Sequence, residues 1–135
     1  EAAKKWIQQD NYGSIAEIFR RWSPNWQFTD ADIEPVRACL SQSGRLEGPL
    51  GYYWSLLALR NGSEGRALLR QRVQVPTLLL LGAADGCFAP QNLLSLDDAF
   101  AAPYEAVVIP RVGHFLHREV PDEVAERILS YFEAV

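Results

Sequence analysis

A short, leucine-rich apolar run occupies residues 77–81 and ends at Gly82, and few folds can accommodate it. Five residues are too few for a stable helix, and the run lacks the alternation of apolar and polar positions that a half-exposed strand has. Uniformly apolar runs of this length are typical of parallel strands covered on both faces. The sequence therefore predicts a buried parallel strand here, with Asp85 in the loop just beyond its carboxyl end.

A second run, at residues 106–109, is rich in β-branched residues and predicts another strand, with His114 in the loop that follows. The intervening stretch, residues 90–100, has room for about three helical turns. Strand, helix and strand form a crossover unit, whose two strands are parallel and end at the same edge of the sheet. If the strands are neighbours, Asp85 and His114 meet at the edge where open α/β sheets bind ligands. A carboxylate can then orient an imidazole.

The two loops resemble motifs of the α/β-hydrolase family, nearest its epoxide hydrolase and haloalkane dehalogenase branch. The stretch V-P-T-L-L-L-L-G-A-A-D-G contains the G-x-x-D turn of the family's acid, and G-H-F-L-H-R-E-V-P contains the loop of its base. The resemblance implies that Asp85 is the acid and that His114 is the general base, which deprotonates water or the hydroxyl of a serine nucleophile. The alternatives are an Asp–Gly turn residue and an ordinary loop histidine.

The resemblance covers essentially the whole chain and implies an α/β fold. It makes residues 1–72 a helical cap, or lid, and residues 73–135 the last two parallel strands and flanking helices of the hydrolase core. Helical patterns in the cap part include F-T-D-A-D-I-E and G-P-L-G-Y-Y-W-S-L. This division predicts that the cap and the strands are separate parts of the protein.

Several details of the helices follow from local signals. A turn is expected at residues 11–13, and Thr29 and Asp32 each offer an N-cap for the next helix. A start near Asp32 would leave Pro35 in the first turn, where a missing N–H costs nothing. The last helix starts at Pro121. Its predicted buried face consists of Val124, Ile128 and Phe132.

Tyr53 is the candidate substrate-binding residue of the cap. Epoxide-opening relatives use cap tyrosines to hydrogen-bond the epoxide oxygen, and Tyr53 occupies the matching position, although Trp54 stands where that pattern often has arginine. A phenol O–H there could stabilise a forming alkoxide. The alternative is a core tyrosine on an apolar stripe with Leu50, Trp54 and Leu57.

The nucleophile that the resemblance requires is missing from this sequence. The family places a Ser, Asp or Cys on a strand-to-helix elbow such as G-x-S-x-G, and no Gly–Ser pair here follows a buried strand. We therefore expect the N-terminal part of the same hydrolase to supply it, and this chain alone to be inactive. The identity of the nucleophile would decide whether the small-molecule substrate is an ester, an epoxide or a carbon–halogen compound.

Charge and composition exclude other classes of partner. The 135 residues have a formal net charge of -4 and a pI near 5.1, without the basic stripe that nucleic acid or an anionic membrane would attract. Cys39 and Cys87 lack the spacing of a disulfide framework, which favours a reducing, cytoplasmic location. No cofactor is implied. A metal site formed by His117, Asp85 and Cys87 matches no zinc template; His117 and Glu119 are instead expected to hold the loop in place.

The chain begins at Glu1 and contains no methionine, so we expect it to be a piece of a longer protein. An uncovered flank of the strand at residues 77–81 would expose unpaired backbone groups, which predicts a further segment beside it. The upstream part of the same protein is the simplest such segment, and a second copy of this chain is an alternative. In a different class of function, the chain would be a non-catalytic binding module that retains the cap.

Overall fold

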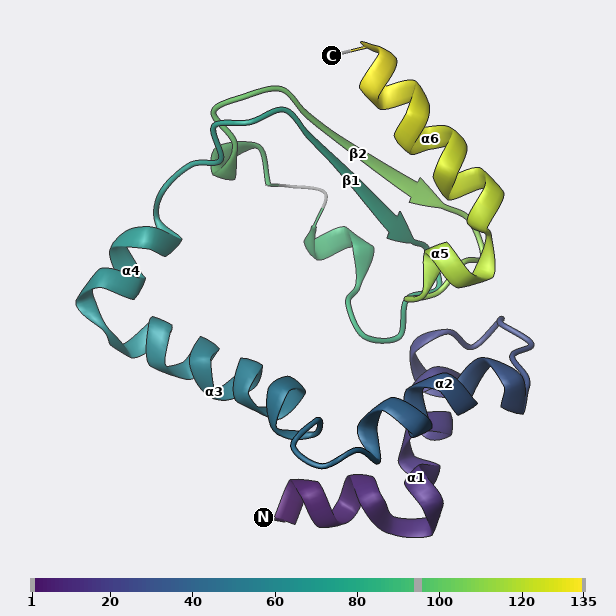
Figure 1. Ribbon diagram of the computed structural model, residues 1–135. Helices are drawn as coiled ribbons and strands as arrows, with labels where there is room; N and C mark the ends of the chain where they lie inside the picture. The colour runs from purple at the N-terminus through teal and green to yellow at the C-terminus, as the bar shows by residue number, and fades with distance from the viewer. Residues whose placement is uncertain (1, 94–95, 135) are drawn as a thin grey trace. The chain divides into compact units, whose positions relative to one another are not determined.

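The computed structural model describes residues 2–93 and 96–134, which form two compact units (Figure 1). The first unit contains residues 2–17 and 28–71, and the second contains residues 18–27 and 72–134. The segment at residues 18–27 thus belongs to the unit that holds the strands, although it precedes most of the helical unit in the sequence. The division at residue 73 into cap and core stays a prediction about domains.

Helices make up the first unit, namely α1 (Ala2–Trp22), whose C-terminal turns belong to the second unit, α2 (Asp30–Leu40), α3 (Glu47–Asn61) and α4 (Ser63–Leu69). The helical conformation of α1 is interrupted from Gln9 to Tyr12, and Asp10, Asn11 and Tyr12 have positive φ angles. Asn and Asp tolerate the left-handed region better than other non-glycine residues. The predicted break in this helix is therefore confirmed, slightly earlier than the expected turn.

The start of α2 is set by Thr29. Its backbone N–H and its hydroxyl both donate to Oδ2 of Asp32, at 2.8 Å each, in a capping-box arrangement. Because the helix begins directly after Thr29, Pro35 lies in its interior. The expected placement of Pro35 in the first turn is wrong: the cap formed by Thr29 starts the helix two residues before Asp32, and the proline leaves one carbonyl of the ladder without its usual donor.

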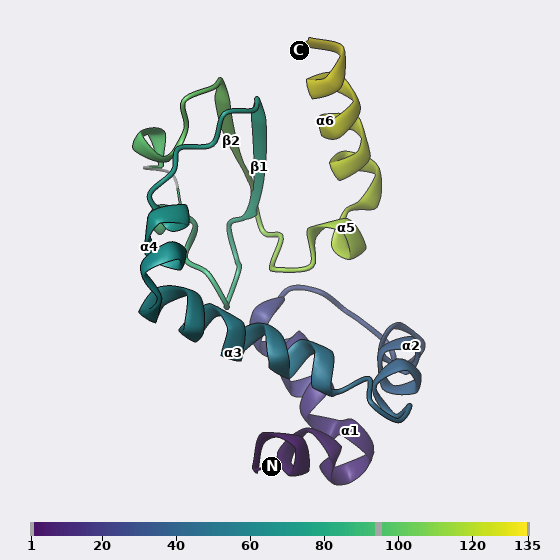
Figure 2. The same cartoon turned by 60° about the vertical axis from the view of Figure 1, so that its left-hand side comes forward.

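The second unit is built on two parallel strands, β1 (Thr77–Gly82) and β2 (Tyr104–Ile109). They pair directly in a register that runs from Thr77 opposite Tyr104 to Gly82 opposite Ile109. The prediction of neighbouring parallel strands is confirmed. The short helix α5 (Leu116–Glu119) follows β2, and α6 (Pro121–Ala134) runs alongside the strands in both views (Figures 1 and 2).

The connection between the strands differs from the predicted three-turn helix. Its described residues form two 3₁₀ turns, η1 (Pro90–Asn92) and η2 (Asp97–Ala99); residues 94 and 95 lie outside the described residues. A helix of three turns is marginal unless packing stabilises an apolar face. The described part of this connection takes the short 3₁₀ form common in connectors instead.

The core of the second unit centres on Ile109, Val112 and Val124, against which Leu80, Leu116 and Val120 pack. The predicted buried face of α6 is correct only at its start: Val124 is 8% exposed, whereas Ile128 is 39% and Phe132 is 71% exposed. Neighbouring strands are spaced about 4.8 Å apart, so a sheet of two strands is too narrow to cover the apolar face of a helix of this length. The C-terminal turns of α6 therefore lack a covering layer in the described part of the chain.

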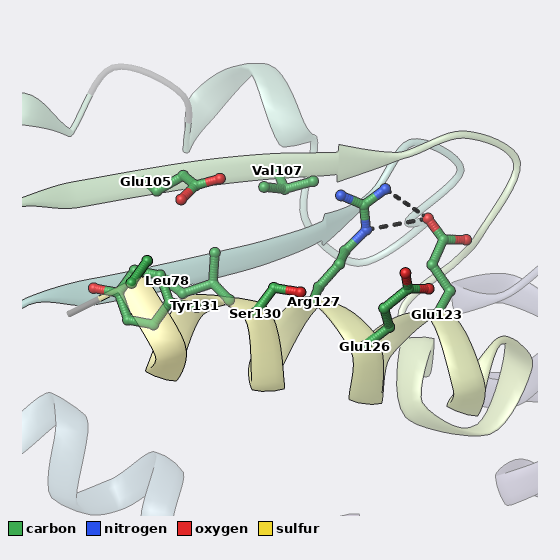
Figure 3. A pocket seen from close by; sticks show the side chains of 9 residues that line it. Leu78, Glu105, Val107, Glu123, Glu126, Arg127, Ser130 and Tyr131 are labelled. Atoms are coloured by element: carbon green, nitrogen blue, oxygen red, sulfur yellow. Dashed lines mark hydrogen bonds and ion pairs between the residues drawn. The ribbon is translucent and has the colours of Figure 1, made fainter.

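Two hollows lie between α6 and the sheet. One, of about 460 Å³, is bordered by Leu78, Glu105 and Tyr131 and by an ion pair in which Nη2 of Arg127 lies 2.7 Å from Oε1 of Glu123 (Figure 3). The other, of about 510 Å³, is more apolar and is lined by residues that include Leu80, Ile128 and Phe132. No helix in the described part of the chain is both long enough and apolar enough to cross a bilayer.

Candidate active site

Asp85 and His114 meet at the carboxyl ends of the two strands. Asp85 lies in the loop after β1 and His114 in the loop between β2 and α5. Nδ1 of His114 is 2.9 Å from Oδ2 of Asp85, and the side chains are 26% and 9% exposed, respectively. The contact expected from the parallel crossover is therefore present. The catalytic roles of the two residues are a separate question.

The second carboxylate oxygen of Asp85 organises its own loop. Oδ1 accepts hydrogen bonds from the backbone N–H groups of Cys87, at 2.7 Å, and Phe88, at 3.0 Å. Short polar side chains commonly stabilise turns in this way. Asp85 is thus both a turn residue, through Oδ1, and a partner of the imidazole, through Oδ2. The turn fixes the carboxylate that faces His114.

The electrostatics of the pair define the histidine tautomer. Burial by itself raises the pKa of Asp85, but hydrogen bonds from the Phe88 N–H, the His114 ring and the Cys87 N–H outweigh it and hold that pKa below its ordinary value. The carboxylate is therefore ionised at neutral pH and can only accept hydrogen bonds. Nδ1 of His114 is therefore the donor of this bond, and Nε2 is the nitrogen that can accept a proton when the ring is in its neutral form.

Aromatic rings surround the imidazole. The Trp22 ring lies 4.8 Å from it, centroid to centroid, in an edge orientation, and the Phe115 and Phe88 rings lie at 5.3 Å and 5.9 Å. Nε2 has no hydrogen-bond partner among the described residues. Nε2 can therefore take up a proton and release it again, because no other group of the described residues competes for that proton.

Two glycines let the backbones of the site approach one another closely. A Cβ on Gly86 would overlap the carbonyl oxygen of Arg21, and a Cβ on Gly113 would lie 2.6 Å from Oγ and 2.8 Å from Cβ of Ser23. Both loops therefore press against the same segment, residues 21–23 at the end of α1. The site consists of three backbone segments, and the sequence analysis identified only two of them.

Sequence analysis did not identify Trp22 or Ser23 as site residues. No local pattern distinguishes Ser23 from other serines, although the glycine that begins G-H-F-x-H-x-E could have indicated a close backbone neighbour. Glu119 was expected to hold the loop, and its carboxylate does accept from Gly113 N–H, at 2.9 Å. His117 was expected to do the same, but its exposed side chain makes no hydrogen bond within the described residues. That expectation for His117 is wrong, because the side chain projects from α5 to solvent.

Cys87 does not supply a nucleophile in this arrangement. Burial raises the pKa of its thiol, the Asp85 carboxylate raises it further, and Arg21 opposes both only in part. The thiol is therefore protonated at neutral pH and poorly reactive. The described residues contain no cluster of three His, Cys, Asp or Glu side chains that could hold a metal ion.

Tyr53 lies on α3 in the first unit and is 59% exposed, beside the ring of Tyr52. It borders a hollow of about 390 Å³ together with Lys4, Glu47 and Trp54. Lys4 and Glu47 form an ion pair of 2.6 Å there. Within this unit Tyr53, Trp54 and Leu57 of the predicted stripe are exposed and Leu50 is half-buried, so the described residues do not form a core around Tyr53. The role of Tyr53 in binding substrate stays a prediction.

Comparison with known proteins finds relatives that are named as hydrolases. It is 32% identical over 93 residues to epoxide hydrolase 3 of Xenopus tropicalis, a match that covers 69% of this chain and 24% of that protein. It is 39% identical over 61 residues to an uncharacterized carboxylesterase of Bacillus subtilis, covering 45% of this chain and 20% of that protein. The chain thus spans about a quarter of the length of these relatives.

Comparison with solved structures finds a relative of the same kind as the sequence comparison does. A crystal structure of a protein provisionally named an epoxide hydrolase, from Klebsiella pneumoniae, matches 95% of this chain and 44% of its own, with a TM-score of 0.78 and 25% sequence identity. No model of a protein family matches the sequence. The predicted α/β class, the C-terminal part of an α/β-hydrolase preceded by helices, is confirmed.

Proposed function

We propose that the complete protein is a hydrolase, because over the part that it spans this chain belongs to the epoxide hydrolase-like family of α/β-hydrolases. Its nucleophile lies outside the 135 residues, in the N-terminal part of the same hydrolase, which is the proposed partner of this chain. His114 is the general base and Asp85 is the acid that orients it. The substrate is a small molecule.

One observation supports this proposal above all others. An ionised carboxylate and an imidazole are 2.9 Å apart at the carboxyl ends of two parallel strands, with the proton on Nδ1 and an unoccupied Nε2. This is the base and orienting acid of a triad, and it lacks only a nucleophile within reach of Nε2.

The roles of the two residues follow from the proton balance. If the nucleophile is a carboxylate, it attacks the carbon that bears the leaving oxygen or halide and forms an alkyl ester. Nε2 of His114 then removes a proton from water, and the hydroxide attacks the ester carbonyl. The bond between the carbonyl carbon and the alkyl oxygen breaks, and the alkoxide takes the proton of the new carboxylic acid, which releases the alcohol and restores the carboxylate. The proton on Nε2 passes to solvent when a halide has left, or replaces the proton that the epoxide oxygen took up. If the nucleophile is a serine, Nε2 takes the hydroxyl proton and returns it to the leaving group. In both cases Asp85 stabilises the imidazolium.

Tyr53 is the proposed substrate-binding residue. Its exposed phenol on α3 can donate a hydrogen bond, and the hollow beside it provides a surface that is apolar on Trp54 and charged on Lys4. A donor of this type would stabilise the alkoxide formed when an epoxide opens, whereas ester hydrolysis would not require it. Tyr53→Phe should therefore slow turnover of an epoxide more than turnover of an ester.

The test uses the complete protein and the His114→Ala variant with ester, epoxide and haloalkane substrates. We expect the variant to lose turnover by a factor on the order of 10²–10⁴. With a carboxylate nucleophile it should also accumulate a covalent alkyl ester, seen as added mass on the intact protein. His117→Ala is the matched control and should retain activity, because its side chain is exposed and unbonded. Undiminished turnover in His114→Ala would refute the proposal.

A further inference from the structure

Ser23 links the end of α1 to the loop of the general base. Its side chain is fully buried, and its hydroxyl accepts hydrogen bonds from the backbone N–H groups of His114, at 2.9 Å, and Phe115, at 3.2 Å. The same hydroxyl donates to Oε1 of Glu119, at 2.7 Å. One donor and two acceptor positions are all that a serine hydroxyl has. Every one of them is used to fix residues 114–119.

Glu119 completes this connection from the other side. Oε2 accepts from Gly113 N–H at 2.9 Å, while Oε1 accepts from Phe115 N–H at 3.2 Å in addition to the Ser23 hydroxyl. Together Ser23 and Glu119 bind the backbone N–H groups before, at and after His114. Neither side chain makes a hydrogen bond to the imidazole ring within the described residues. Their effect on the base can therefore act only through the backbone position of its loop.

The carbonyl of Trp22 joins this loop to the loop of the acid. It accepts one hydrogen bond from Gly86 N–H, at 3.0 Å, and one from His114 N–H, at 3.1 Å. The two lone pairs of a single carbonyl thus hold one residue from each loop. The close approaches of Gly86 and Gly113 to residues 21–23 allow this geometry. A shift of the end of α1 would move both loops.

We propose that Ser23 and Glu119 are positioning residues of the acid–base pair, and that the Trp22 carbonyl sets the separation between Asp85 and His114. This inference rests on the proposed function for its kinetic consequence, but its structural consequence can be measured independently. The hydrogen bond between Nδ1 and Asp85 depends on where the His114 backbone lies. Loss of the Ser23 hydroxyl would remove the shorter of the two bonds of the His114 N–H and leave it only the Trp22 carbonyl at 3.1 Å, while Oε1 of Glu119 would lose its hydroxyl donor. The backbone at His114 would then be held less tightly.

Ser23→Ala in the complete protein tests the proposal, and Ser14→Ala is its matched control. Ser14 is also buried and also uses its hydroxyl, which donates to the carbonyl of Ile7 at 3.3 Å, but it lies in the first unit. Proton and nitrogen-15 NMR of labelled histidine report the hydrogen-bonded Nδ1 proton of His114. We expect Ser23→Ala to weaken or abolish that signal and to lower kcat by about 10²-fold with little change in KM. Ser14→Ala should leave both unchanged.

Glu119→Gln provides a second variant of nearly equal size, in case Ser23→Ala does not fold. It replaces one acceptor oxygen with a donor that faces a backbone N–H or the Ser23 hydroxyl, so the same losses are expected. Glu126→Gln on the exposed side of α6 is its control. A retained Nδ1 signal and kcat in the folded Ser23→Ala or Glu119→Gln variant would overturn the proposal. An altered signal together with full turnover in His114→Ala would leave the positioning role intact and refute the proposed function instead.

Discussion

Two regions of the second unit differ in what the chain provides for them: one has hydrogen-bond partners for its polar groups, and the other has apolar side chains without a covering layer. At the site edge, formed by the loops of Asp85 and His114 and by residues 21–23, both oxygens of Asp85 and both lone pairs of the Trp22 carbonyl have partners. At the α6 face, formed by Leu78, Ile128 and Phe132, an apolar hollow of about 510 Å³ lies open. The same chain therefore supplies the hydrogen-bond partners that hold the loops of Asp85 and His114, but leaves an apolar layer incomplete.

The physical reason is that hydrogen bonds act between single groups, whereas apolar stabilisation depends on surface area. Hydrogen bonds are short and directional, so three backbone segments suffice to satisfy a compact polar site. Apolar stabilisation grows with the area removed from water, and it needs whole layers packed face to face. Polar geometry at the site edge is thus determined within this chain, whereas burial of the α6 face requires surface that the described residues do not provide.

The largest effect should come from Asp85→Asn at the site edge. An amide can donate as well as accept, so it no longer fixes the proton on Nδ1 and cannot stabilise an imidazolium. We expect kcat of the complete protein to fall on the order of 10²–10⁴-fold. Steady-state kinetics measure the loss, and a thermal melt checks that the fold survives. A fall below threefold would mean that the pair has no role in turnover.

Gly113→Ala should have the next largest effect, because it forces a Cβ into Ser23. We expect a loss of about 1–3 kcal/mol in the free energy of unfolding, or more if the loop cannot move. Gly51→Ala in α3 is the control: apart from its chain neighbours and the nearby backbone of its own helix, no described atom lies within 4 Å of the added carbon, and the helix should gain roughly 0.5–1 kcal/mol. Urea unfolding measures both. Similar responses at the two glycines would contradict the close packing at the site edge.

The α6 face can be tested with a pair of truncations on one helix. Val124→Ala removes two methyl groups from the core and should cost about 1–2 kcal/mol, whereas Phe132→Ala should change the stability of this chain by at most about 0.5 kcal/mol. In the complete protein, a larger loss for Phe132→Ala would mean that a further segment covers this face, as the strand at residues 77–81 predicts. Denaturant midpoints of both variants in both proteins give the comparison.

The smallest effect concerns pH. The pKa of Asp85 is lower in the folded chain than its ordinary value near 3.9, so the carboxylate favours the folded state above that pH. This contribution should disappear as pH falls from about 4 through the lowered pKa, because the unfolded state then binds the proton first. The stability of Asp85→Asn should therefore fall less steeply over this acidic range. Identical slopes in the variant and the parent would contradict the lowered pKa.

Sequence patterns predicted the parts of the fold that depend on neighbouring residues. The leucine-rich run and the β-branched run fixed two parallel strands, and the direction of parallel strands put Asp85 and His114 at one edge. Local signals failed where competing packing or capping decided the outcome. Thr29 started α2 earlier than Asp32 would have, and the connection at residues 90–100 formed 3₁₀ turns in its described part. These are differences of local energy too small for a sequence pattern to resolve.

Strand period and chain direction are properties of contiguous residues, so the amino-acid sequence is enough to predict that a carboxylate and an imidazole meet at one edge of the sheet. The residues that hold this pair in place can be identified only in the folded chain. Ser23 lies 91 residues from His114 in the sequence, and a serine after a tryptophan resembles any helix end. Its role exists because folding brings its hydroxyl to two backbone N–H groups and a carboxylate at once. Contacts of this kind depend on coordinates in space, and no periodicity in the chain encodes them.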